Sequence, residues 1–192
     1  MIVLRTGCWT SRPFCGCFLA LFLGAALSQA AQDTNGKHLD SGTEEMLRSR
    51  DTAFAISASQ GGIAKVQLGS LAASKAGDPA VKAFGRQMVD DHTKADDRLA
   101  SLAQEQNMTL PANLTAKDQA LYDKLSQLSG AAFDKAYVSG MLKDHKKDVK
   151  AFRKEAGSGK NPKIKNFAAE TLPILQHHLD EVKSIQSRSS EK

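Results

Sequence analysis

After residue 17 this chain of 192 residues contains neither cysteine nor tryptophan. Its three cysteines are Cys8, Cys15 and Cys17, and its only tryptophan is Trp9. The rest of the chain therefore has no disulfide framework and no Cys-His nucleophile. It also lacks a glycine-rich phosphate loop, a nucleophile elbow and any run typical of a β-strand. These absences favour an all-α protein without a recognisable catalytic set.

Long hydrophobic runs are missing too. The longest, Phe14 to Leu27, has about 14 residues, whereas a membrane-spanning helix needs roughly 20. Arg5 and Arg12 precede this run, and Ser28-Gln29-Ala30 follows it with small residues suited to signal-peptidase cleavage. We therefore predict a signal peptide over residues 1–30 and export to the periplasm, the outer membrane or the exterior. A retained anchor is the alternative.

The charge of the remaining chain is small. Removing residues 1–30 takes away two arginines and no acid, which leaves 24 basic and 21 acidic residues, a net charge of +3. This balance does not indicate nucleic-acid binding. We expect a flexible polar linker over residues 31–49, a helical domain over 50–188 and a disordered tail over 189–192.

Four long stretches carry apolar residues at steps of three and four, which is typical of amphipathic helices. They span residues 52–75, 79–107, 131–156 and 162–187. Asp51 is the expected N-cap of the first, and a capping-box pattern at Thr115–Asp118 opens a shorter helix to about residue 128. The pattern predicts a four-helix bundle with an extra short helix between the second and third long helices. The segment 108–130 is long enough to cross the length of the bundle.

A heptapeptide with a central Asp-His pair occurs twice. Met88–Lys94 is echoed 53 residues later by Met141–Lys147, and each copy places its histidine, His92 or His145, on the apolar stripe of a helix. The pair His177-His178 holds the same place in the last helix. Lys65, His92, His145 and His178 all fall within about one turn of their helix midpoints. Mid-helix residues meet at one height in a bundle, so we expect the three histidines to converge.

Two interpretations of this layer are open. Three imidazoles match the ligand set of zinc or another first-row metal such as iron, with Asp91 and Asp144 as further ligands or as acceptors that orient the rings. Alternatively, the layer is a hydrogen-bonded polar contact that fixes the register of the helices. An Asp next to a His points about 100° away from it on a helix, so both aspartates would line the rim or face solvent.

A di-iron centre of the ferroxidase type is not expected. Such centres use a Glu from each of two helices and Glu-x-x-His from the other two. The residues three positions before the histidines are Val89, Leu142, Ile174 and Leu175. The first helix offers Lys65 where a carboxylate is needed. We therefore predict that the protein is not an enzyme of this kind.

Basic residues gather between positions 143 and 165. They are Lys143, Lys146, Lys147, Lys150, Arg153, Lys154, Lys160, Lys163 and Lys165. One interpretation is a contact with an anionic envelope surface or an acidic partner. The other is a solvated face that complements the helix dipole.

The segments GGIAKVQLGSLA, FDKAYVSGMLKDHKKDVKAF and LPILQHHLDEV carry a family resemblance. Over about residues 50–186 the chain resembles domain of unknown function 4142, a family of exported bacterial proteins. The resemblance implies a ferritin-like four-helix fold and a location in the cell envelope, and it implies no activity. The family pattern has Glu where this chain has Lys65.

Two functional hypotheses follow. The first is a non-enzymatic binding or envelope-stress module. The second is a metal-binding or metal-storage protein that uses His92, His145 and His178 as ligands.

Overall fold

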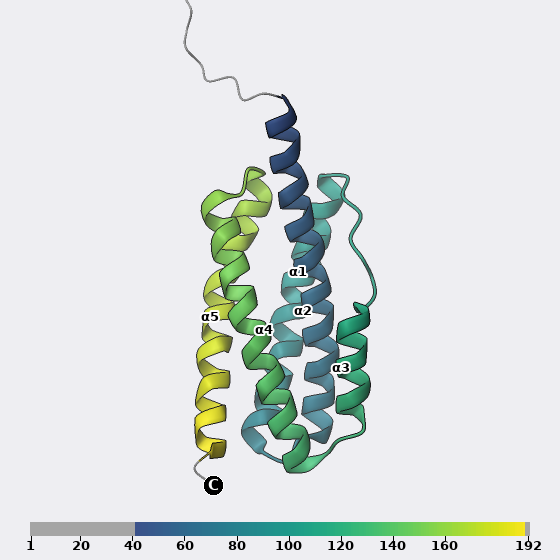
Figure 1. Cartoon of the computed structure of the whole chain (residues 1–192), viewed down its shortest axis with the longest axis vertical. Coiled ribbons are helices and arrows are strands. Elements are labelled where there is room, and N and C mark those ends of the chain that lie inside the picture. The colour runs from purple at the N-terminus through teal and green to yellow at the C-terminus, as the bar shows by residue number, and fades with distance from the viewer. Residues whose placement is uncertain (1–40, 191–192) are drawn as a thin grey trace, which may run out of the picture. The chain divides into compact units, whose positions relative to one another are not determined.

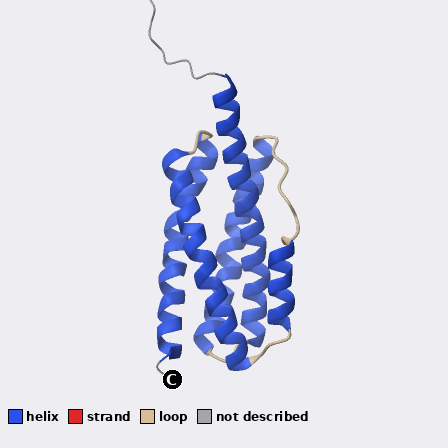
Figure 2. Cartoon of the chain, in the orientation of Figure 1, coloured by secondary structure: helices blue, strands red, loops and turns tan. Residues whose placement is uncertain are grey.

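The computed structural model describes residues 41–190, which form five helices and no strand (Figures 1 and 2). The helices are α1 (Ser41–Lys75), α2 (Pro79–Glu105), α3 (Ala116–Ser126), α4 (Gly130–Ser158) and α5 (Pro162–Ser190). The four long helices pack as a bundle, and α3 lies along its side. The predicted all-α four-helix bundle with one extra short helix is confirmed. No helix in this part of the chain is long and apolar enough to cross a membrane.

The chain direction in the bundle follows from the two kinds of connection. Short turns join α1 to α2 and α4 to α5, so the helices of each pair are antiparallel (Figure 1). The segment from residue 106 to 129, which includes α3, returns along the length of the bundle, so α2 and α4 run parallel. The crossover that the length of this segment permits is therefore present.

Local signals set the helix ends largely as predicted. Asp78 caps α2, because its Oδ1 accepts a hydrogen bond from the Ala80 amide at 2.8 Å, and Pro79 occupies the first helical position. Thr115 Oγ1 accepts from the Asp118 amide at 3.1 Å and donates to Asp118 Oδ2 at 2.6 Å. The first bond of the predicted capping box is thus formed, while the Asp118 carboxyl accepts from the Thr115 hydroxyl and not from its amide.

The start of α1 differs from the prediction. The helix begins at Ser41, so residues 41–49 of the expected linker are helical, and the rest of that linker lies outside the described residues. Good helix formers such as Glu45, Met46 and Arg48 extend the helix although they bury no apolar stripe, and Met46 is 63% exposed. At the other end, α5 continues to Ser190, two residues beyond the predicted end of the bundle.

Asp51 consequently lies inside α1 rather than at its N-cap. Its Oδ2 accepts hydrogen bonds from the Lys160 amide at 2.8 Å and the Asn161 amide at 2.5 Å, just before α5 begins. The buried Glu155 lies beside it. Burial, followed by the charge of Asp51 and a hydrogen bond to it, raises the pKa of Glu155 to about 7.

The apolar core forms two clusters with the predicted histidine layer between them. One cluster contains Phe84, Met88, Phe133, Tyr137, Met141 and Val182. The other contains Leu99, Val149, Phe152, Ile164, Phe167 and Leu175. Helices α1 and α2 approach closely at Gly69 and Gly85, where a Cβ on Gly85 would lie 2.7 Å from the Gly69 carbonyl oxygen.

Candidate functional site

Three histidines meet in the middle of the bundle. His92 comes from α2, His145 from α4 and His178 from α5, and all three are buried. Their ring centroids lie 5.5 to 6.0 Å apart, and one ring nitrogen from each lies within 4.8 Å of the other two. The predicted convergence of the three histidines is confirmed. The adjacent His177 points outward, with 70% of its side chain exposed.

Each ring offers one nitrogen that has no hydrogen-bond partner. His145 Nδ1 lies 2.9 Å from the carbonyl oxygen of Met141, and His178 Nε2 lies 2.9 Å from Asp91 Oδ2. Both partners are acceptors, so these nitrogens carry the hydrogens. The remaining nitrogens, His145 Nε2 and His178 Nδ1, are buried and unpartnered, and so is His92 Nε2. They are unprotonated acceptors in His145 and His178, as metal ligation requires.

Burial keeps the three imidazoles neutral. Loss of hydration lowers the pKa of His92 well below its ordinary value, and the positive charge of Lys65 lowers it further. The same two causes lower the pKa of His145 to about 4. Burial also lowers the pKa of His178, against the opposing effect of Asp91. At neutral pH the layer is therefore a set of three uncharged imidazoles.

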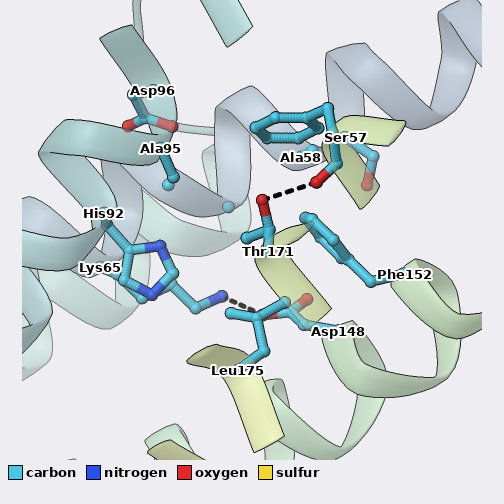
Figure 3. A pocket seen from close by; sticks show the side chains of 13 residues that line it. Ser57, Ala58, Lys65, His92, Ala95, Asp96, Asp148, Phe152, Thr171 and Leu175 are labelled. Carbon is cyan, nitrogen blue, oxygen red and sulfur yellow. Dashed lines mark hydrogen bonds and ion pairs between the residues drawn. The ribbon is translucent and has the colours of Figure 1, made fainter. Parts of the chain in front are cut away.

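Lys65 of α1 completes the layer, as its position in the helix predicts. Its ammonium lies 2.5 Å from Asp148 Oδ2, and its side chain is only 4% exposed (Figure 3). A buried ammonium requires such a partner, because an unpaired charge in the core is strongly destabilising. Lys65 thus brings a positive charge next to His92, and Asp148 compensates it.

The two aspartates of the repeated heptapeptide have different environments. Asp91 contacts the layer, although it pairs with His178 of the neighbouring α5 and not with the adjacent His92. Asp144 Oδ1 lies 3.8 Å from Nζ of the exposed Lys117 of α3. Of the two predicted orienting carboxylates, the structure places only Asp91 against a histidine.

Three further carboxylates near the layer were not predicted. Asp148 follows His145 by three positions, Glu181 follows His178 by three, and Asp96 follows His92 by four. Asp148 pairs with Lys65, and Glu181 Oε2 is buried without a hydrogen-bond partner. Burial raises the pKa of Asp96 to about 7, with Lys65 opposing the rise. The signal that could have found them is an acid three or four positions after each histidine, on the same helix face.

Comparison with known proteins gives one match. The family model described as Domain of unknown function (DUF4142) matches residues 37–185. The chain belongs to the DUF4142 family. No curated protein and no solved structure matches it. Membership in DUF4142 assigns no activity, so the role of the site must be argued from its own geometry.

This DUF4142 member does not fit a dinuclear carboxylate centre. The carboxylates stand after the histidines and not three positions before them, and Lys65 already pairs with Asp148. A di-iron centre instead needs bridging carboxylates free to bind two ions. The site fits one ion held by three imidazoles.

Six of the nine basic residues between positions 143 and 165 share a surface. These six lie on α4 at steps of three and four, all exposed, and we call them the basic face of α4: Lys143, Lys146, Lys147, Lys150, Arg153 and Lys154. The acids of this stretch, Asp144, Asp148 and Glu155, lie about 100° or more from Lys143 around the helix. Lys163, also exposed, forms an ion pair with Glu105.

Proposed function

We propose that this protein binds one divalent transition-metal ion through His92 Nε2, His145 Nε2 and His178 Nδ1. The observation that supports it is the set of three buried ring nitrogens without partners. One ring nitrogen of each histidine lies within 4.8 Å of one from each of the others, and points so spaced lie within about 2.8 Å of a common centre. Zinc–nitrogen bonds are about 2.0–2.1 Å long, so three such nitrogens reach a common ion by movements of less than about 1 Å each. Small side-chain rotations suffice for this.

The second ring nitrogens support the same proposal. Metal-binding histidines usually donate their other N–H to a carboxylate or a backbone carbonyl, which fixes the ring and its tautomer. His178 has Asp91 in this role and His145 has the Met141 carbonyl. A layer that only fixed helix register would instead leave three buried nitrogens unpaired, at a cost of about 1–3 kcal/mol each.

Charge and ligand type favour a borderline metal such as zinc, with iron as another candidate. The neutral rings have two carboxylates nearby, Asp91 against His178 and Asp148 against Lys65, and the one ammonium of Lys65, so the charge of these three groups is negative overall. Imidazole ligands suit zinc, copper, iron and nickel. We place this binding or storage role in the bacterial envelope, on the basis of the predicted signal peptide. The proposed role is non-enzymatic.

Competition between the metal-free protein and a chromophoric zinc chelator tests the proposal. The protein is made without a histidine tag, and we expect one tightly bound zinc per chain. His145→Gln and His178→Gln should each weaken binding by at least about 100-fold, because each removes one of three ligands. His177→Gln is the matched control, since its ring is exposed beside His178, and it should bind like the wild type.

Two results would contradict the proposed metal binding. One is absence of binding at micromolar zinc by the folded wild type, and the other is equal binding by the His145 and His177 variants. Either would leave the histidines as a register layer and favour the hypothesis of a binding or envelope-stress module without metal.

A further inference from the structure

A second position suited to a cation lies directly beside the three histidines. Lys65, His92, Asp96 and Asp148 line a cavity of about 20 Å³, room for about one water molecule (Figure 3). His92 and Asp96 come from α2 and Asp148 comes from α4, and each of the three carries either a carboxylate or an imidazole. Such a set of oxygen and nitrogen donors is one that divalent metals use.

The position is already filled by a cation of the chain itself. The Lys65 ammonium lies 2.5 Å from Asp148 Oδ2, and its charge also acts on Asp96. An ammonium carries three N–H donors, and among the described residues Asp148 is the one carboxylate within ion-pair distance of it. It therefore neutralises Asp148 as a bound ion would.

The backbone of α1 is shaped to admit these charged groups. A Cβ on Gly62 would lie 1.9 Å from Asp96 Oδ1, so the carboxyl occupies space that any other residue would need. A Cβ on the preceding Gly61 would lie 3.6 Å from the Lys65 ammonium. Gly62 thus makes room for the Asp96 carboxyl, whereas a side chain at Gly61 would be in ordinary contact with the ammonium.

We propose that the Lys65 ammonium occupies a second cation position of this bundle and thereby restricts the site to one metal ion. The inference rests on the proposed function, because it concerns the number of ions bound beside the histidine site. It makes Lys65 the residue that determines stoichiometry. Without its charge, the side chains of Asp96 and Asp148 are free to hold a second ion.

Native mass spectrometry of zinc-loaded protein counts the ions per chain and tests this proposal. We expect one zinc for the wild type, two for Lys65→Ala and one for Lys65→Arg, which keeps the positive charge. Adding Asp148→Asn to Lys65→Ala should return the count to one. Lys65→Gln removes the charge with a smaller loss of packing and should also bind two, so it replaces Lys65→Ala if that variant does not fold.

The outcomes separate this inference from the proposed function. A wild type that binds no zinc contradicts the histidine site itself. If the wild type and a folded, uncharged Lys65 variant each bind one zinc, Lys65 does not determine the number of ions. The histidine site is unaffected by that result. Two ions in Lys65→Arg would also overturn it, because the charge would then not be the determinant.

Discussion

Replacing Asp91 by asparagine should weaken metal binding without removing any ligand. Asp91 Oδ2 lies 2.9 Å from His178 Nε2, and this contact keeps the hydrogen on Nε2 and leaves Nδ1 free to bind. An asparagine can accept this hydrogen only weakly. When its NH₂ group faces the ring instead, it favours the tautomer with hydrogen on Nδ1, which cannot bind a metal.

The expected loss follows from the exposure of this pair. Partners of metal-binding histidines contribute about 10–100-fold to affinity. The Asp91 side chain is 27% exposed while His178 is fully buried, so solvent screens part of the interaction. We therefore expect a loss in the lower half of that range, about 10–30-fold, or about 1.4–2 kcal/mol.

The repeated heptapeptide supplies the matched control for this experiment. Asp144 precedes His145 as Asp91 precedes His92, but it lies 3.8 Å from Lys117 of α3. In the chelator competition assay, Asp144→Asn should bind zinc within about twofold of the wild type. Asp91 does not orient His178 for metal binding if Asp91→Asn binds zinc as tightly as the wild type. The same follows if both variants lose equal affinity.

Three further predictions concern packing, pH and the surface. Gly85→Ala should destabilise the fold by about 1–3 kcal/mol in urea unfolding, because its Cβ would lie 2.7 Å from Ala72 Cβ. Gly140→Ala, where the nearest neighbour of the added Cβ is at 3.8 Å, should instead stabilise the fold by up to about 1 kcal/mol. Equal effects of the two substitutions would contradict the close helix contact. The raised pKa of Glu155 makes a stabilising contribution that is complete below about pH 4.5 and is lost as the pH rises through about 7. Between pH 5 and pH 8 the free energy of unfolding of Glu155→Gln should therefore rise by about 1–2 kcal/mol relative to the wild type, after allowance for solvent screening. A difference that does not change with pH would exclude this. The basic face of α4 should bind vesicles of anionic phospholipid at low salt and release them near 0.5 M salt, roughly where screening becomes short-ranged; binding that resists salt, or no binding, would leave it a solvated face.

Most of the fold could be predicted because periodicity reports directly on burial. The stripe through Met88, His92 and Leu99 fixes which face of α2 is buried, whichever helices pack against it. The start of α1 could not be predicted in this way. Its first turns are helical by residue type and carry no apolar stripe to mark them.

The site was predicted in part for a related reason. The height of a residue along its helix follows from its position, so the meeting of the three histidines could be expected. The partner of a side chain that neighbours a histidine in sequence depends on which helix packs against it. Asp91 faces α5 and Asp144 faces α3, a difference that two similar heptapeptides do not contain. The pairing of Lys65 with Asp148 joins α1 to α4 and is equally invisible in either helix alone.

Long-range ¹H–¹⁵N NMR of the imidazole nitrogens, with and without one equivalent of zinc, tests the three-histidine site. We expect neutral rings in the metal-free protein, with hydrogen on Nδ1 of His145 and on Nε2 of His178. Zinc should then shift His145 Nε2, His178 Nδ1 and His92 Nε2, and leave the exposed His177 unchanged. Unchanged spectra of the three buried rings, or a zinc response confined to His177, would contradict the proposed site.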